Sequence, residues 1–345
     1  MARRRFLATA GMALAASLVW PRRSQGQVAN DPTSRLRPPR LQPGDHVGII
    51  SPAGAMRESR DLEITWQAMT RLGLIPRLGA HTRNRYGYLA GQDRDRAADI
   101  NRFFTDPTIK ALVPIRGDWG SARVLPYLDY GVIRQNPKIL VGFSDITALL
   151  LGIYAQTGLV TFHGPHGVTS WSAAQTQPFR QVLFDGEAIA LGQRSSATSN
   201  STISTPARVI TPGQARGPLI GGNLSVVAGI AGSPYMPDLR GAILFLEDVG
   251  EAVYRVDRML TQLRLAGALD GLAGFIFGQC TRCSAADGSL PLEQVLQDHI
   301  APLGIPAWSG ALLGHVEPIL TVPIGAEVTM DAGRGLVQMR QPAVR

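Results

Sequence analysis

The sequence predicts an α/β protein with two domains. Helices cover both faces of a mostly parallel sheet in the N-terminal domain, and the C-terminal domain is smaller and of the α+β type. Apolar segments of strand length alternate with amphipathic segments of helix length through the first half of the chain, and a second block follows a change in composition. A chain of 345 residues, 45% of them hydrophobic, is long enough to bury two cores.

The predicted N-terminal domain covers residues 40–170. We expect strands at 46–51, 74–78, 109–115 and 138–143, and helices at 59–72, 93–104, 120–128 and 146–154. Ligands gather at the carboxyl ends of strands in such sheets. The polar loops 116–120 and 142–145 follow two of these strands, so we expect a functional site there.

The predicted C-terminal domain covers residues 216–338, after a segment rich in Ser, Thr, Gln and Ala. That composition is typical of a linker or a mobile surface segment, which we assign to 171–215. We expect a helix ending at residue 231, a strand at 242–246, a helix at 251–266, and strands near 274–278 and 328–330. The strands lack the regular spacing of a sandwich, which favours an α+β arrangement.

The N-terminal end predicts export. Residues 1–26 hold five arginines and no acid, and three of these arginines precede an apolar run at 7–20. This pattern is typical of a twin-arginine signal peptide, which we assign to 1–29. We therefore expect a periplasmic protein with no stable membrane span once the signal is removed, since the apolar run is short for a span.

Without its first 26 residues, the chain is only modestly basic. Removing the five positive charges lowers the formal net charge from +8 to +3 (8 − 5 = 3), so the basic character belongs largely to the export signal. We therefore expect no binding to nucleic acid.

The chain has two cysteines, Cys280 and Cys283, at the end of the apolar run 274–279. Two thiols are too few for a zinc site without help from other ligands, and we expect no metal. In an oxidising compartment the pair predicts either a local disulfide or two unreactive thiols.

Ser144 lies where an apolar strand turns into an apolar helix. A hydroxyl at such a turn lies near unpaired backbone N–H groups that can hold a developing oxyanion, which suits a nucleophile. The alternative is an ordinary helix N-cap followed by Asp145 in the first turn. The local pattern leaves both open.

A serine nucleophile needs a base and a carboxylate that orients the base. Among the six histidines, His163 and His315 are the candidates, and composition does not choose between them. Glu247 ends the apolar strand 242–246, where it either pairs with a partner or meets water as a strand-end charge.

Several motifs in one order, between residues 40 and 335, resemble the LD-carboxypeptidase family of serine peptidases, which also includes the microcin C7 self-immunity proteins. The motifs are Arg116-Gly-Asp-Trp-Gly120, Gly142-Phe-Ser-Asp-Ile-Thr147, His163-Gly-Pro165, Gly217-Pro-Leu-Ile-Gly-Gly-Asn-Leu224, Phe245-Leu-Glu-Asp-Val249 with Tyr254-Arg-Val-Asp257, and Gly314-His-Val-Glu-Pro318.

The resemblance implies a flavodoxin-like or glutamine-amidotransferase-like N-terminal domain and a catalytic triad. Ser144 matches the family's nucleophile, Glu247 its acid and His315 its base. The family needs no metal or other cofactor for this chemistry. Two subunits commonly associate in the family, so the resemblance also implies a homodimer.

The resemblance places the oxyanion hole at the backbone N–H of Asp145 and one N–H of the Gly117–Asp118 turn. The family usually has two glycines after the arginine, whereas this chain has Gly117 and Asp118. If the second position needs a positive φ, aspartate tolerates it better than most residues but less well than glycine.

The implied activity is hydrolysis of the L,D amide bond before the terminal D-alanine of peptidoglycan tetrapeptides. Arg116 is a candidate to bind the terminal carboxylate, because a guanidinium matches that group in shape, and Asn223 is a candidate to donate to the peptide backbone. The alternatives are a microcin-immunity-like amidase of aminoacyl nucleotide analogues and an inactive muropeptide-binding protein.

Overall fold

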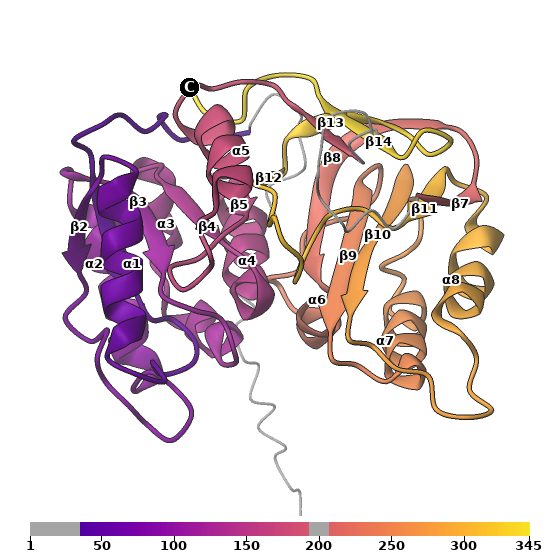
Figure 1. Cartoon of the computed structure of the whole chain (residues 1–345), viewed down its shortest axis with the longest axis horizontal. Helices are drawn as coiled ribbons and strands as arrows, with labels where there is room; N and C mark the ends of the chain where they lie inside the picture. The colour runs from indigo at the N-terminus through magenta and orange to yellow at the C-terminus, as the bar shows by residue number, and fades with distance from the viewer. Residues whose placement is uncertain (1–34, 193–206) are drawn as a thin grey trace, which may run out of the picture.

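The computed structural model describes residues 35–192 and 207–345, in which two sheets lie side by side (Figure 1). The predicted signal peptide and residues 193–206 of the predicted linker lie outside this range. Within it, no helix has both the length and the apolar character needed to cross a bilayer.

The first sheet has six strands in the order β12-β5-β4-β3-β1-β2. Strands β1 to β5 run parallel, and β12 joins the edge antiparallel to β5. The strands are β1 (His46–Ile50), β2 (Ile75–Leu78), β3 (Ile109–Pro114), β4 (Ile139–Gly142), β5 (Thr161–His163) and β12 (Val322–Ile324). The predicted parallel sheet is therefore confirmed, and a strand from the C-terminal part of the chain completes it.

The predicted helices of this half lie close to observed ones, but the helix at Tyr130–Gln135 was not predicted and one predicted helix differs in type. The predicted helix at 120–128 is a 3-10 helix with Pro126 inside it, because proline has no N–H for an α-helical bond and clashes with the preceding turn. The helices are α1 (Arg60–Arg71), α2 (Asp93–Thr105), η1 (Ser121–Tyr127), α3 (Tyr130–Gln135), η2 (Ser144–Ile146), α4 (Thr147–Thr157) and α5 (Ala173–Leu183).

Helix α4 lies between the two halves (Figure 1). It packs on β4 and β5 of the first sheet and on β8 and α6 of the second half. Its residues are buried on every side except at Ala155 and Gln156, as expected for a helix that is apolar all round. The turn that precedes α4 is thereby fixed at the junction of the two halves.

The second sheet has eight strands in the order β6-β14-β13-β8-β9-β10-β11-β7. Its four middle strands, β8 to β11, are parallel, and the outer strands are antiparallel. The strands are β6 (Ala190–Gly192), β7 (Arg208–Thr211), β8 (Gln214–Asn223), β9 (Ile243–Val249), β10 (Gly274–Thr281), β11 (Ala307–Ser309), β13 (Glu327–Asp331) and β14 (Leu336–Met339).

The helices of the second half are α6 (Leu224–Ile230), α7 (Val253–Leu265), α8 (Leu292–Ile300) and η3 (Ala301–Leu303). Helix α7 forms because its apolar residues recur at intervals of three and four and make one face that is buried. These residues are Val253, Val256, Leu260 and Leu263.

The linker predicted at 171–215 is wrong in part. Helix α5 lies within it and buries Phe179 and Val182, while β6, β7 and the start of β8 join the second sheet. Helix α5 was not predicted, because its Gln and Thr residues and the proline at position 178 make the helical spacing of its apolar residues hard to recognise in the sequence. Because of these added strands, the second sheet has more strands than the first, although a smaller domain was expected.

Candidate active site

Ser144 lies in the turn between β4 and α4, at the carboxyl edge of the first sheet. Its φ is 60°, a value that residues other than glycine seldom adopt and that is over-represented at functional sites. Phe143 occupies the cap position of η2, and no side chain caps that helix or α4. The N-cap alternative for Ser144 is therefore wrong.

The loop after β3 lies directly against this turn. A Cβ atom placed on Gly117 would lie 3.0 Å from Cβ and 3.2 Å from Oγ of Ser144, and 3.3 Å from the backbone N of Asp145. These contacts would be tighter than is usual for a Cβ atom, so a side chain here would require the serine turn to shift by a few tenths of an ångström. The two backbone segments predicted to form an oxyanion hole are thus brought together beside the serine.

The side chain of Asp145 fastens these two loops to each other. Its carboxylate accepts a hydrogen bond of 2.7 Å from the backbone N–H of Ser121, and the Ser121 hydroxyl donates to the Asp145 carbonyl. Burial raises the pKa of Asp145, although the hydrogen bonds from Ser121 oppose that shift. The sequence motif contains Asp145, but its side-chain role was not predicted.

Glu247 and His315 form the central polar pair of the site. Oε2 of Glu247 lies 2.9 Å from Nδ1 of His315 and also accepts the backbone N–H of His315 at 3.3 Å. The Glu247 side chain has no exposure to solvent, so the alternative of a hydrated strand-end charge is wrong. A carboxylate at Nδ1 fixes the proton there and leaves Nε2, on the other side of the ring, able to accept one.

Gly314 makes this pair possible. Its φ is 96°, and a Cβ atom placed on it would lie 2.1 Å from Oε2 of Glu247. A larger residue would push the loop away from the carboxylate. The glycine before His315 therefore brings the histidine within hydrogen-bonding distance of Glu247.

Phe143 connects the histidine loop to the serine turn. The ring of His315 packs edge-on against Phe143, the residue before Ser144, with the ring centroids 4.9 Å apart. His166 stacks on the same phenylalanine with centroids 4.5 Å apart. The structure thus gathers the serine turn, His315 and Glu247 at one place from three distant segments.

His163, the other candidate base, lies behind this pair. It is fully buried, and neither ring nitrogen has a hydrogen-bond partner among the described residues. The pKa of His163 is lowered to about 4, chiefly by burial; the charge of Glu247 opposes this shift and His315 adds to it. Of the two candidates, His315 is the one that pairs with a carboxylate.

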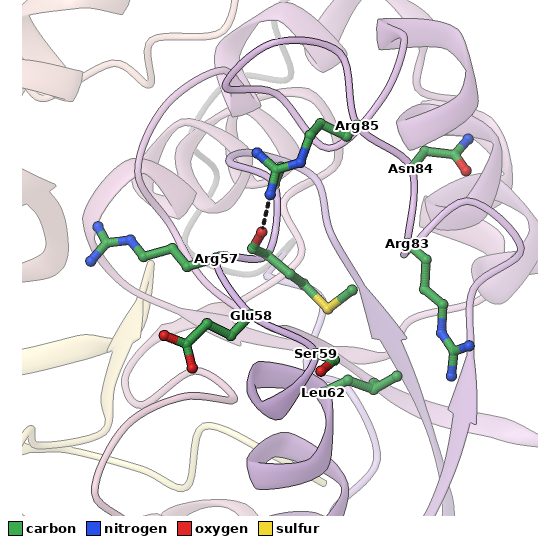
Figure 2. A pocket seen from close by; sticks show the side chains of 9 residues that line it. Arg57, Glu58, Ser59, Leu62, Arg83, Asn84 and Arg85 are labelled. Atoms are coloured by element: carbon green, nitrogen blue, oxygen red, sulfur yellow. Dashed lines mark hydrogen bonds between the residues drawn. The ribbon is translucent and has the colours of Figure 1, made fainter.

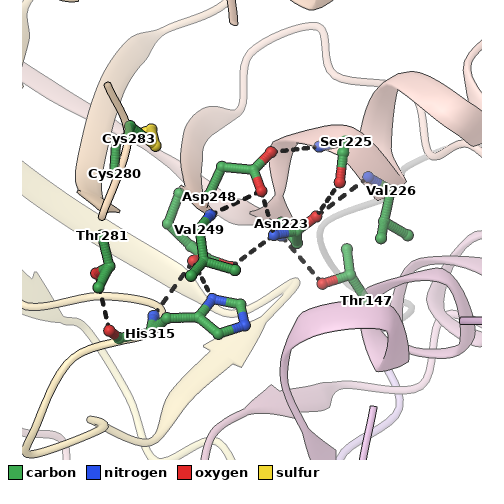
Figure 3. A network of polar contacts seen from close by, with 11 residues as sticks. Thr147, Asn223, Ser225, Val226, Asp248, Val249, Cys280, Thr281, Cys283 and His315 are labelled. Carbon is green, nitrogen blue, oxygen red and sulfur yellow. Dashed lines mark hydrogen bonds and ion pairs between the residues drawn. A yellow bond between two sulfur atoms is a disulfide. The ribbon is translucent and has the colours of Figure 1, made fainter. Parts of the chain in front are cut away.

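Asn223, a predicted substrate-binding residue, has its amide group engaged within the protein. Its Oδ1 caps α6 by accepting the backbone N–H of Val226, and its Nδ2 donates to Asp248 at 3.0 Å and to Glu247 at 3.4 Å (Figure 3). These contacts place Asn223 in support of the carboxylate of the pair, while substrate binding by Asn223 stays a prediction.

Thr147 was not singled out by sequence reasoning, although it belongs to the motif that contains Ser144. Its Oγ1 accepts the backbone N–H of Asn223 at 3.1 Å, which ties the start of α4 to the end of β8 (Figure 3). This bond joins the serine segment to the segment that supports Glu247.

Arg116, the other predicted substrate-binding residue, is buried between two carboxylates. Its Nε lies 2.7 Å from Asp118, and its Nη1 lies 3.1 Å from Asp61. Arg57 also pairs with Asp118, at 3.2 Å. Both carboxylates already compensate the charge of Arg116, which argues against its prediction as a binder of the substrate carboxylate.

Asp118 adopts a φ of 78°, so the position does require the conformation that glycine provides most easily. A pocket of about 350 Å³ is lined by the loops around Arg57 and Arg85, and Arg57 is also an ion-pair partner of Asp118 (Figure 2). Arg85 donates to the backbone carbonyl of Met56 at 2.5 Å. Arg83 and Glu58 also line the pocket, so its lining carries a positive balance.

No group of three or more His, Cys, Asp or Glu side chains in residues 35–192 and 207–345 is arranged to hold a metal ion. Cys280 and Cys283 form a disulfide, which decides between the two possibilities that the sequence left open.

Comparison with known proteins assigns the family. A sequence model of the LD-carboxypeptidase N-terminal domain matches residues 47–164, and one of the LD-carboxypeptidase C-terminal domain matches residues 216–330. The chain belongs to the LD-carboxypeptidase family. The matched regions together contain Ser144, Glu247 and His315.

Relatives within the LD-carboxypeptidase family cover nearly the whole chain. The probable murein peptide carboxypeptidase of Bacillus subtilis is 39% identical over 86% of this chain and 91% of its own length. The murein tetrapeptide carboxypeptidase of Pseudomonas aeruginosa is 32% identical over 85% of this chain and 95% of its own length. The solved structure of the microcin self-immunity protein MccF with glutamyl sulfamoyl guanosine superposes with a TM-score of 0.80 and 28% identity, covering 90% of this chain and 100% of that one.

Proposed function

We propose that this LD-carboxypeptidase family member is a serine peptidase that removes the terminal D-alanine from peptidoglycan tetrapeptides. The observation that carries the proposal is the 2.9 Å pair of Glu247 and His315 beside the strained turn of Ser144. The names of the relatives from Bacillus subtilis and Pseudomonas aeruginosa support murein peptides as the substrate class.

In the proposed first step, Nε2 of His315 takes the proton of Ser144 Oγ as that oxygen attacks the carbonyl carbon before D-alanine. The backbone N–H of Asp145 and one N–H of the Gly117–Asp118 turn stabilise the resulting oxyanion. Glu247 stabilises the imidazolium of His315. When the carbonyl re-forms, the C–N bond breaks, and His315 gives its proton to the departing amine.

In the second step, water hydrolyses the acyl-enzyme. His315 takes a proton from the water, whose oxygen attacks the ester carbonyl of Ser144. The ester C–O bond then breaks, the proton returns to Ser144 Oγ, and the tripeptide leaves with a new carboxylate. Throughout this cycle Glu247 orients and stabilises the histidine.

The mature protein should convert a disaccharide tetrapeptide to the tripeptide and free D-alanine. The Ser144→Ala variant should lose this activity by at least about 10⁴-fold, as expected when a nucleophile is removed. Product formation is measured by chromatography and mass spectrometry. Absence of tripeptide from the wild-type reaction, under conditions where a known enzyme works, would contradict the proposal.

A second candidate is an amidase of aminoacyl nucleotide analogues. The similarity to MccF favours it, since that structure contains glutamyl sulfamoyl guanosine. Incubating the same preparation with an aminoacyl sulfamoyl nucleoside distinguishes the two. Faster turnover of this compound than of the tetrapeptide would favour the amidase, and no turnover of either would favour a binding protein.

We also propose export through the twin-arginine signal and action in the periplasm, where murein fragments occur. The arginine-rich apolar segment at 1–29 supports this location. Homodimer formation and the absence of nucleic-acid binding stay predictions, the first from the resemblance and the second from the modest charge of the mature chain.

A further inference from the structure

The main chain of His315 is held at both of its polar atoms. Its N–H donates to Glu247 Oε2, and its carbonyl accepts a hydrogen bond of 2.8 Å from the hydroxyl of Thr281 (Figure 3). The first contact belongs to the Glu247–His315 pair already described. The second comes from the last residue of β10 and has no part in the proposed chemical steps.

Thr281 ends a strand that is irregular just before it. The register of β10 against β9 shifts between Phe277 and Cys280, and regular pairing resumes for only two residues, Cys280 with Asp248 and Thr281 with Val249. The position of the Thr281 hydroxyl therefore depends on the turn that follows the strand.

The disulfide between Cys280 and Cys283 closes that turn (Figure 3). Inside it, Arg282 has a φ of 57°, a conformation that costs free energy for a residue with a side chain. The backbone N–H of Cys283 donates to the carbonyl of Cys280 at 3.1 Å. The covalent link opposes the tendency of the turn to open and relieve Arg282.

We propose that Thr281 is a positioning residue for His315, and that the Cys280–Cys283 disulfide holds it in place, so that the enzyme reaches its full rate only in the oxidised form. This inference rests on the proposed function. If it holds, full activity requires a compartment that is oxidising enough to maintain the disulfide, although hydrolysis itself involves no redox step.

The redox step is a thiol–disulfide exchange with a dithiol. The S–S bond of the protein breaks, its two sulfurs take up two electrons and two protons, and the dithiol becomes a cyclic disulfide. Both cysteines are partly exposed to solvent, so a small dithiol can reach them. Because the chain has only these two cysteines, any direct effect of a dithiol on the protein comes from this pair.

The first test removes the hydroxyl alone. We expect Thr281→Val to lower kcat by about 5-fold with KM nearly unchanged, which corresponds to one hydrogen bond of about 1 kcal/mol, and Thr281→Ser to retain the wild-type rate. Thr70→Val is the matched control, because the Thr70 hydroxyl also donates to a backbone carbonyl, that of Trp66, but in α1. A wild-type kcat in Thr281→Val would overturn the inference.

The second test changes the redox state. Treatment with dithiothreitol should lower kcat to about the level of Thr281→Val, with two thiols appearing by titration, and reoxidation should restore it. The Cys280→Ser/Cys283→Ser variant should have the reduced rate before and after treatment, with a native circular dichroism spectrum. Equal rates for the oxidised and reduced wild type would overturn the role of the disulfide.

Labelling of Ser144 by a fluorophosphonate separates this inference from the proposed function. If labelling slows in Thr281→Val and in the reduced protein while no tetrapeptide is cleaved, the substrate assignment fails and the positioning role stands. Equal labelling rates in all forms, or no labelling of the oxidised wild type, would overturn the positioning role whatever the substrate.

Discussion

At the scale of single residues, the backbone around the site departs from ordinary geometry. Ser144, Asp118 and Arg282 all have a positive φ, and each lies in a loop that holds part of the proposed machinery. Such conformations persist only where the surrounding contacts enforce them. The sequence marks this for Asp118, because the family usually has glycine there, but carries no such signal at Arg282.

Two substitutions at Asp118 separate two contributions to the free energy of unfolding: the strain of its backbone conformation and the ion pairs of its carboxylate. Both Asp118→Gly and Asp118→Ala remove the ion pairs with Arg116 and Arg57, but only alanine must still adopt a φ near 78° with a Cβ. We expect the alanine variant to have a free energy of unfolding lower by about 1 kcal/mol than the glycine variant, measured in urea. Equal stabilities would show that the loop relaxes.

His163 predicts a pH dependence of stability. Its pKa is about 4 in the folded protein because the ring is buried, against about 6.5 when unfolded. As the pH falls below 6.5 the unfolded chain binds a proton that the folded protein does not, so stability is lost from about pH 6.5 down to about pH 4. At pH 5 the loss from this one histidine is about 2 kcal/mol.

The His163→Leu variant tests this dependence, because it removes the titrating group and keeps an apolar side chain between Phe143 and Phe245. The drop in the free energy of unfolding between pH 7.5 and pH 5 should be smaller in the variant by about 2 kcal/mol. His166 remains in both proteins and contributes equally. An unchanged pH profile would mean that His163 is solvated or paired in solution.

At the scale of elements, Asn223 connects the end of β8, the start of α6 and the carboxylates that follow β9. Its carbonyl caps the helix, and its amide N–H groups face Glu247 and Asp248. Both carboxylates are buried, and this burial raises the pKa of Asp248 to about 6. The Asn223 side chain thus both caps α6 and donates a hydrogen bond to Glu247, the acid of the pair.

Substitution of Asn223 separates these two contributions. Asn223→Ser keeps an oxygen able to cap α6 but loses the donors to the carboxylates, whereas Asn223→Ala loses both. Urea unfolding should rank the wild type first, the serine variant second and the alanine variant last, with about 1 kcal/mol between the two variants. Equal stability of the two variants would mean that the cap contributes nothing.

The elements that the sequence predicted well are those with a clear apolar period or a continuous apolar run. Strand β9 is buried at its first six residues, and α7 buries one stripe, so both were found. Helix α8 was missed, although Val295, Leu296, His299 and Ile300 make a buried face, because the helix is only nine residues long and four of them are Glu, Gln or Asp. The short strands β11 and β14 were missed because their ends depend on pairing partners far away in the chain.

At the scale of the whole molecule, the two halves are joined by more than the chain connection. Strand β12 pairs with β5 across the boundary, Arg35 forms an ion pair of 3.0 Å with Glu327, and the backbone of Arg345 bonds to that of Pro38 and Arg40. These long-range pairings have no local sequence signal, so a boundary drawn along the chain missed them.

The site likewise depends on contacts between distant segments of the chain. Residue patterns offered Ser144, Glu247 and two histidines as separate candidates, and the resemblance to a family joined three of them. The 2.9 Å contact between residues 247 and 315 depends on Gly314 and on the register of two sheets, which local patterns do not encode. The contacts of Asn223 with Glu247 and Asp248, and that of Arg116 with Asp61, were not predicted, because these partners come from other segments of the chain.

The most direct test of the central claim is the rate at which a fluorophosphonate labels Ser144, followed by mass spectrometry in the wild type and in single variants. We predict no label in Ser144→Ala, labelling about 100-fold slower or more in His315→Ala, and a rate close to wild type in His163→Ala. Labelling that is lost in His163→Ala and retained in His315→Ala would contradict the account.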